Sequence, residues 1–239
     1  MILAAGAVLL LALGPIGWRA HWWDLRFSLL TLMSYSAYLG IAAIVAGVTA
    51  LAASGGRAGR GGLVLAIIAI VVGAVIAYVP WHYRAVAAGV PRIHDITTDT
   101  ANPPAFVAVV PLRQAEGGNP ATYEGAKIAA LQEKAYPDLA PLKVALAPPK
   151  AFDLALATAK EMGWTIVATD PQAGRIEASQ RSFWYGFTDD IVVRVAASGN
   201  GSRIDVRSSA RHGRSDFGVN AARVSRYLAA LRKSAAATG

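Results

Sequence analysis

Residues 27–53 read FSLLTLMSYSAYLGIAAIVAGVTALAA, and residues 63–81 read LVLAIIAIVVGAVIAYVPW. Neither stretch contains Asp, Glu, Lys, Arg or His. A helix rises about 1.5 Å per residue, so roughly 20 apolar residues cross a hydrocarbon core about 30 Å thick. Both stretches meet this length, and the sequence therefore predicts a protein that spans a membrane.

A third apolar stretch, residues 1–18, precedes these two and is interrupted near its end by Gly14, Pro15 and Gly17. The alternative is a cleaved signal peptide, but such peptides carry a basic n-region, and no charged residue precedes this apolar core. We expect a retained helix and hence a membrane domain, residues 1–81, with helices at about 1–18, 27–53 and 63–81. Aromatic side chains fall where an interfacial belt is expected: Trp18, Trp22, Trp23, Tyr78, Trp81 and Tyr83.

The orientation rests on weak charge differences between the two short loops. Arg19 and Arg26 in the first loop balance Arg57 and Arg60 in the second, so the positive-inside rule is nearly silent. The second loop has no acidic residue, which favours the cytoplasm for it. We therefore expect a multi-pass inner-membrane protein of a bacterium, with its soluble domain in the periplasm. The absence of cysteine is compatible with either compartment.

The soluble part begins with residues 82–120, which contain five prolines and few periodic apolar residues. This composition predicts an extended strap lying on the domain that follows. Residues 121–239 form the predicted domain. Its first helix is expected at residues 121–135, where Ile128 and Leu131 share one side.

A clearer alternation of elements starts at Pro148. Apolar residues recur at helical spacing from Phe152 to Met162 and predict a helix that ends at Gly163. Four strands are predicted next. They lie at residues 164–169, at 175–180, around Ile191, Val193 and Val195 before a turn at Ser198, and at 203–211, and a last helix begins near Asp216. This order predicts an α+β fold in which an antiparallel sheet of about four strands packs helices on one face.

Two long motifs carry a resemblance to a known family. The first is RIHDITTD at residues 92–99, followed by NPP at 102–104; the second is DVRSSAR at 205–211, followed by GRSDFGVN at 213–220. Over roughly residues 91–233 the chain resembles the domain of unknown function 1499 family. The resemblance implies no activity, because the family has none established, but it places the polar clusters in signature positions. For His94, Asp95 and Asp99 we expect hydrogen bonds that fix the strap.

The C-terminal segment 203–233 is strongly basic, with eight Arg or Lys against two Asp. In one interpretation this face contacts anionic lipid headgroups. The favoured interpretation is a solvated sheet face whose arginines pair with acidic residues, because exposed ion pairs are common and individually weak. The expected acidic partners are Asp189, Asp190, Asp205 and Asp216.

Polar residues of these motifs form the candidate ligand or partner surface: Asp189, Asp190, Arg207, Arg211, Arg214, Asp216 and Asn220. The predicted function is a non-enzymatic envelope component that binds a protein or lipid partner. The expected partners are membrane lipid, another membrane protein or a second copy of the chain. The alternative is a hydrolase or transferase acting on an anionic or lipidic substrate, with the carboxylates as acid and base. If these side chains lie on different faces, neither single-site interpretation holds.

Other chemistries find little support in the sequence. Four histidines without paired spacing and no cysteine predict no metal site, and no Gly-rich phosphate loop or other cofactor motif is found. Nucleic acid is not expected, because the aromatic residues at 183–187 cluster in one loop instead of spreading over a sheet. That loop is predicted to cover the core; insertion into the bilayer interface or contact with a partner are the alternatives.

Overall fold

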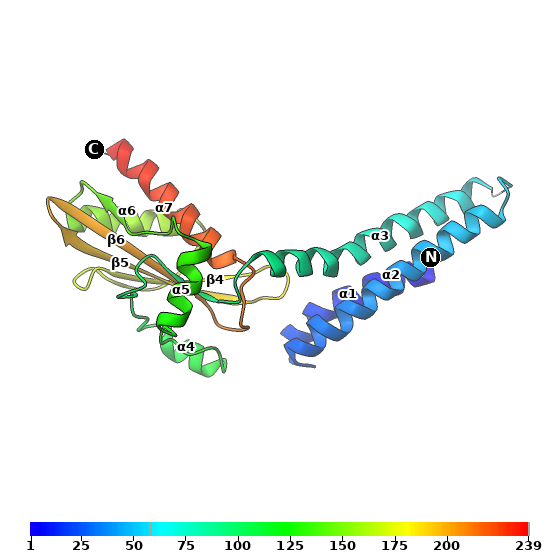
Figure 1. Cartoon of the computed structure of the whole chain (residues 1–239), viewed down its shortest axis with the longest axis horizontal. Coiled ribbons are helices and arrows are strands. Elements are labelled where there is room, and N and C mark those ends of the chain that lie inside the picture. The colour runs from blue at the N-terminus through cyan, green and yellow to red at the C-terminus, as the bar shows by residue number, and fades with distance from the viewer. Residues whose placement is uncertain (58, 239) are drawn as a thin grey trace. The chain divides into compact units, whose positions relative to one another are not determined.

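The computed structural model describes residues 1–57 and 59–238, which form two compact units (Figure 1). Unit 1 comprises residues 1–88 together with 183–186, and unit 2 comprises residues 89–182 and 187–239. Ala58, in the second predicted loop, and Gly239 lie outside the described residues.

Unit 1 contains α1 (Ile2–Arg19), a π-helical turn η1 (Phe27–Leu32) that leads into α2 (Met33–Ala53), and α3 (Arg60–Gly89). Three of its helical segments have the length and apolarity to cross a membrane, as the sequence predicts. α3 extends well beyond the predicted end at residue 81. The prediction ended the helix where the apolar run ends. The helix itself continues through residues 82–89, which include His82 and Arg84 and are less suited to lipid but compatible with a helix.

Small residues allow α2 and α3 to pack closely. A Cβ atom added to Gly40 would lie 2.7 Å from the Gly73 carbonyl oxygen, and one added to Gly47 would lie 2.7 Å from the Ile70 side chain. Such backbone proximity is the usual role of small residues between helices in lipid. Gly40, Ala43 and Gly47 follow one another at intervals of three or four residues and are buried, whereas Ala50, which continues this spacing, is exposed.

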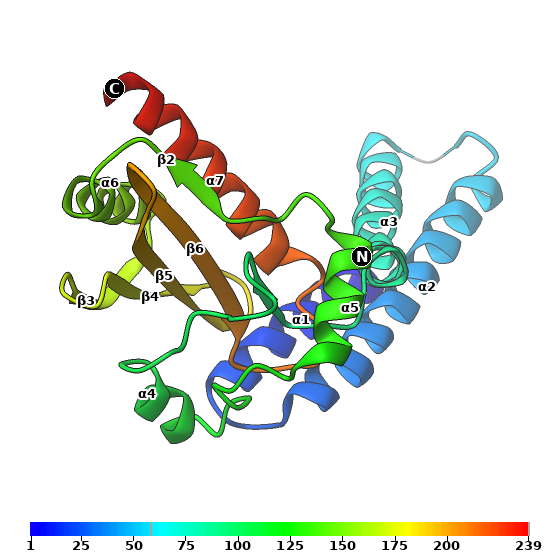
Figure 2. The same ribbon diagram turned by 60° about the vertical axis from the view of Figure 1, so that its left-hand side comes forward.

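Unit 2 is built on a six-stranded antiparallel sheet (Figure 2). The strand order is β1 (Asp95–Thr97), β6 (Gly201–Ala210), β5 (Thr188–Ser198), β4 (Arg175–Arg181) and β3 (Thr165–Asp170), and β2 (Leu142–Val144) also pairs with β6. The predicted meander of four strands, β3 to β6, is confirmed. The two additional strands have three residues each, which is too short for a visible alternation of side chains.

One face of the sheet, here called the helix face, carries α6 (Pro148–Glu161) and α7 (Val219–Thr238). Both views place these two helices on the same side of the sheet and α4 (Val110–Ala115) on the other. Ile191, Val193, Ile204 and Val206 alternate along the central strands and are fully or almost fully buried in this core. The Tyr227 hydroxyl donates to the Ala155 carbonyl at 2.7 Å and links the two helices.

The opposite face, here called the strap face, is covered by the segment from residue 98 to residue 123. Phe106 and Val109 pack on Val192 of β5 in a small second core. The backbone amides of Val107, Ala108 and Val109 each donate to the Glu177 carboxylate at 3.0 Å. A fully buried carboxylate thus holds the chain where α4 begins.

The strap ends before α5 (Ala126–Ala135), which starts five residues later than the predicted helix at 121. Gly125 precedes it with a φ of 82°, a conformation that glycine adopts without steric cost. Gln132 of α5 is buried; its side-chain amide donates to the Thr97 carbonyl at 2.6 Å and accepts from the Thr97 amide at 2.9 Å. The side chain thereby pairs with β1 as a neighbouring strand would.

Candidate functional site

Asp190 of β5 is the centre of the charged network on the strap face and has no exposed surface. Arg113 of α4 donates to its Oδ2 at 2.9 Å, and Arg211 donates to both oxygens at 2.9 and 2.8 Å. The Ser179 hydroxyl adds a bond of 2.7 Å. All five N–H groups of Arg113 have acceptors, since it also donates to Asn119, Ser209 and Ala210. Asp190 therefore fixes the strap rather than facing solvent.

Arg207 of β6 and Asp95 of β1 form a second buried pair. The guanidinium donates from Nε at 2.9 Å and from Nη2 at 2.6 Å to the two Asp95 oxygens. It also donates to the carbonyls of Pro104 and Ala121 in the strap, so four of its five N–H groups have acceptors among the described residues. Its carbon Cζ lies 4.6 Å from the centre of the Phe106 ring.

A third, partly exposed group extends the pairing towards the other end of the sheet. Asp99 accepts from Arg194 at 3.0 Å and from Arg203 at 2.7 Å, and both arginines also bind Asp205. Of the four expected acidic partners, Asp189, Asp190 and Asp205 do pair with arginines, whereas Asp216 accepts from backbone amides, and the face is not solvated as expected. The strap covers this face, because ion pairs, hydrogen bonds to its backbone and the small Phe106–Val109 core hold it on the strands.

Residues predicted for the same surface lie on the helix face instead. Asp189 accepts from Arg223 at 2.6 Å, and Arg223 also donates to Ser208 at 3.0 Å and closely to Asn220. Burial raises the pKa of the Asp189 carboxyl, although Arg223 opposes the effect. Neighbouring positions on a strand alternate between faces, so Asp189 and Asp190 cannot share a site.

The remaining predicted residues have separate positions. Asp216 accepts from the amides of Gly218 at 2.9 Å and Asn220 at 2.7 Å at the start of α7, and burial raises its pKa. Arg214 is exposed. His94 is buried; its carbonyl accepts from Asn220 at 3.1 Å and its Nδ1 lies 3.7 Å from Glu124. The structure therefore divides the predicted set. Asp190, Arg207 and Arg211 lie on the strap face with Asp95 and Asp99, whereas Asn220 joins Asp216 and the His94 carbonyl and shares Arg223 with Asp189.

A pocket of about 550 Å³ opens beside Arg207, between the strap and the sheet. Its apolar lining includes Phe106, Val110 and Ala121, and its polar lining includes Arg113, Arg207 and Tyr123. The Tyr123 hydroxyl is buried and has no hydrogen-bond partner among the described residues, a property it shares there only with Nε1 of Trp164. Burial is the largest cause that raises the pKa of Tyr123 to about 12, so the hydroxyl is a neutral donor.

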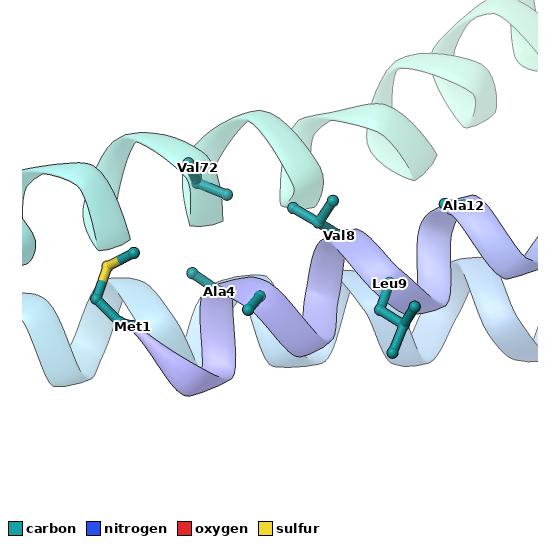
Figure 3. A pocket seen from close by; sticks show the side chains of 7 residues that line it. Met1, Ala4, Val8, Leu9, Ala12 and Val72 are labelled. Atoms are coloured by element: carbon teal, nitrogen blue, oxygen red, sulfur yellow. The ribbon is translucent and has the colours of Figure 1, made fainter.

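A second hollow, of about 460 Å³, lies among the membrane helices of unit 1 (Figure 3). Figure 3 shows Val8 and Ala4 of α1 near Val72 of α3. The lining of this hollow is almost wholly apolar. Without polar groups it has no means of fixing a ligand's orientation. We regard it as part of the lipid-facing surface.

Sequence reasoning missed Arg113, Phe106, Tyr123 and Glu177, which build the pocket and hold the strap. The prolines predicted the strap, but no periodic pattern marks the side chains by which it attaches. The excess of basic residues around β6 indicated that acidic partners must lie elsewhere in the domain, but it did not indicate which residues these are. Within residues 1–57 and 59–238, no group of three His, Asp or Glu side chains is arranged to hold a metal ion.

Comparisons with known proteins complete the description. Among solved structures, the crystal structure of Ara h 8.0201 is 13% identical, with a TM-score of 0.24, 41% of this chain covered and 95% of that chain. The crystal structure of TTHA0849 from Thermus thermophilus is 14% identical, with a TM-score of 0.23 and coverages of 39% and 90%. No curated protein matches the chain. The family model described as "Protein of unknown function (DUF1499)" matches residues 95–231, more than half of the sequence, and the chain therefore belongs to the DUF1499 family.

Proposed function

We propose that this protein is a membrane-anchored, non-enzymatic binding protein whose soluble domain takes part of a lipid into the strap pocket. The observation that carries the proposal is the strap pocket itself, whose lining combines apolar side chains with Arg207 and Tyr123; the Tyr123 hydroxyl is buried and has no hydrogen-bond partner among the described residues. Buried polar atoms in folded proteins nearly always have partners, and a small rotation of the Tyr123 side chain on ligand binding would give its hydroxyl the missing acceptor. The pocket volume lies within the usual range for small-molecule sites, roughly 300–1,000 Å³.

The chemistry of the lining defines the ligand class. Tyr123 offers a hydroxyl donor, and Arg207 has one N–H group beyond the four that have acceptors. Because Asp95 already balances the charge of Arg207, the pocket favours an acceptor group without demanding a full negative charge. A phosphate or ester oxygen of a lipid meets this requirement, and Phe106 and Val110 provide contact for apolar atoms.

The enzymatic alternative would use Asp189 and Asp216, whose pKa values burial raises above the ordinary range, as a general acid requires. Both carboxylates already have structural partners, namely Arg223 and the first amides of α7. They also lie on the helix face, away from the pocket. These partners favour the binding function over hydrolysis or group transfer.

A photoactivatable lysophosphatidylglycerol provides the test, with the full chain in vesicles of phosphatidylethanolamine and phosphatidylglycerol. We expect crosslinks within residues 103–123. With Tyr123→Phe the affinity for the probe, measured from the crosslinked fraction at increasing probe concentration, should fall about 2- to 10-fold, because one hydrogen bond of about 0.5–1.5 kcal/mol is removed. Arg214→Ala, an exposed change outside the pocket, serves as the control. Crosslinks confined to residues 1–89, or equal labelling of the Tyr123→Phe variant, would refute the proposal.

For the location, we propose the inner membrane with unit 2 in the periplasm, supported by the acid-free second loop. The cysteine-free chain allows a direct test with an impermeant thiol reagent on intact cells with a permeabilised outer membrane. A Cβ added at Gly59 meets nothing within 4 Å, and Asn200 is exposed in the β5–β6 turn. We expect Asn200→Cys to react and Gly59→Cys to stay protected; the reverse pattern would place the domain in the cytoplasm.

A further inference from the structure

The loop that joins β4 to β5 has a closed base and an aromatic tip. The Ser182 amide donates to the Phe187 carbonyl at 2.8 Å, and the Phe187 amide donates to the Ser182 hydroxyl at 2.9 Å. Gly186 permits the turn with a φ of 68°. Between these residues, Phe183 is 95% exposed and Trp184 50% exposed, so the prediction that this loop covers the core is wrong for both.

The third aromatic residue of the tip, Tyr185, is buried within unit 1, to which residues 183–186 belong. The Ser28 hydroxyl at the start of the second span donates to the Tyr185 hydroxyl at 3.2 Å. Gly14 makes room for this pair, since a Cβ there would lie 3.1 Å from one hydroxyl oxygen and 3.2 Å from the other. Arg19 at the end of α1 reaches the Phe183 carbonyl at 3.4 Å.

The residues around this contact have the composition of a membrane–water boundary. Trp22 is 64% exposed and stacks edge-on with Trp23, which in turn lies 5.6 Å from Phe27. Tryptophan and tyrosine concentrate at the level of the lipid headgroups. Three crossings of a bilayer also bring residues 90 onward to the side where residues 20–26 lie, so the loop and this boundary share one side.

We infer that Phe183 and Trp184 insert into the headgroup region of the bilayer, and that Tyr185 holds the loop at that level through Ser28. Exposed rings this large are unfavourable in water. At the interface both rings find apolar contacts, and the indole N–H of Trp184 finds a hydrogen-bond acceptor. The occupant is the phospholipid interface itself, because the tip continues the aromatic belt of the membrane helices. The inference is independent of any ligand in the strap pocket.

Site-directed spin labelling tests the insertion, with the full chain in vesicles of phosphatidylethanolamine and phosphatidylglycerol. Nitroxides are placed singly at Phe183→Cys, at Trp22→Cys as the interfacial reference and at Asn200→Cys as the aqueous reference. Collision with oxygen and with a water-soluble nickel chelate reports the depth of each label. We expect the label at 183 to match the depth of the label at 22; a depth equal to that at 200 would overturn the insertion.

Two further measurements separate the remaining explanations. Short label-to-label distances between molecules at position 183 would assign the tip to contact between copies and overturn the bilayer as occupant. With Tyr185→Phe, which keeps the ring and removes the hydroxyl bond, we expect the label at 183 to become more mobile and shallower. An unchanged spectrum and depth would overturn the holding role of Tyr185. Because Phe183 is exposed, its substitution carries little risk of misfolding.

Discussion

The two faces of the sheet in unit 2 are held by different forces. On the helix face, apolar side chains of β5 and β6 meet those of α6 and α7, and burial of nonpolar surface is the main stabilising term. On the strap face, arginines of β6, of the position just after it and of α4 meet carboxylates from β1, β5 and the strap. Apolar contacts tolerate substitution, whereas a buried charge demands its partner. The helix face also holds one buried pair, Asp189 with Arg223, but the strap face depends on such pairs along its whole length, so we expect it to be the more sensitive to loss of a single charge.

The largest effect is expected for Asp190→Asn, which keeps the side-chain size and removes the negative charge shared by Arg113 and Arg211. Removing one partner of a buried pair costs about 3–5 kcal/mol. We expect a lower unfolding midpoint of the full chain in detergent and new tryptic cleavage after Arg113, which is 1% exposed in the folded protein.

The matched control for this change is Asp170→Asn, in a partly exposed pair with Arg175 on the same sheet. Exposed pairs contribute about 0–1 kcal/mol, so this variant should differ little from the wild type. An equal loss of unfolding free energy in the two variants would mean that the buried pairs of Asp190 stabilise the domain no more than an exposed pair does.

A comparable but less site-specific loss is expected for Leu231→Ala, in the buried stripe of α7. Removing a buried leucine costs about 2–5 kcal/mol through lost transfer energy and the cavity left behind. Because the strap pairs remain intact, Arg113 should stay resistant to trypsin until the whole domain unfolds. Early cleavage after Arg113 in this variant would show that the two faces are not separable.

A smaller effect concerns Asp216 and its dependence on pH. Burial raises its folded-state pKa above that in the unfolded chain, so its contribution to stability is full below the unfolded value and is lost as pH rises through the folded value. Asp216→Asn removes this titration and keeps an acceptor for the Gly218 amide. As pH rises above about 4, the ordinary pKa of an aspartate, we expect the wild type to lose stability relative to this variant.

Thermal unfolding of both proteins across that range checks the prediction. Asp216→Ala should lose about 1 kcal/mol at every pH, because it also removes the cap of α7. A wild type that gains stability over Asp216→Asn as pH rises would contradict the sign.

The smallest effect is expected for Arg214→Ala, on the loop between β6 and α7. Its side chain is exposed, and surface substitutions of this kind change stability by at most about 0.5 kcal/mol. Thermal unfolding should therefore be unchanged. A large loss would place Arg214 in an interaction comparable to those of Arg207 and Arg211.

The helix face could be predicted from the sequence almost completely, because its signals are periodic. Ile191, Val193 and Val195 alternate, and α7 shows Val224, Leu228 and Leu231 at helical spacing, so the elements and their buried sides followed directly. The membrane helices followed from apolar length. Boundaries were less certain, as α3 and α5 show, because a helix end depends on local hydrogen bonds that composition does not specify.

The strap face could be predicted only in part. Arg207 and Asp95 were both singled out, but nothing in their spacing states that residues 112 positions apart pair with each other. Arg113 and Glu177 lie in segments without motif character, and their roles depend entirely on the tertiary fold. The predicted surface combined Asp189 with Asp190. Side chains of adjacent strand residues point to opposite faces of the sheet, so this alternation alone would have assigned the two carboxylates to different surfaces.

The separation in sequence between the strap and its partners has a consequence for synthesis of the chain. At about 5–20 residues per second, Asp95 leaves the ribosome roughly 6 to 20 seconds before Arg207 does. During this interval residues 95–119 have no sheet on which to lie. Carboxylates and guanidinium groups remain hydrated while they wait, whereas an apolar strap of the same length would be open to aggregation next to a membrane. The ionic attachment of β1 and the strap thus suits segments that are synthesised before the strands on which they lie.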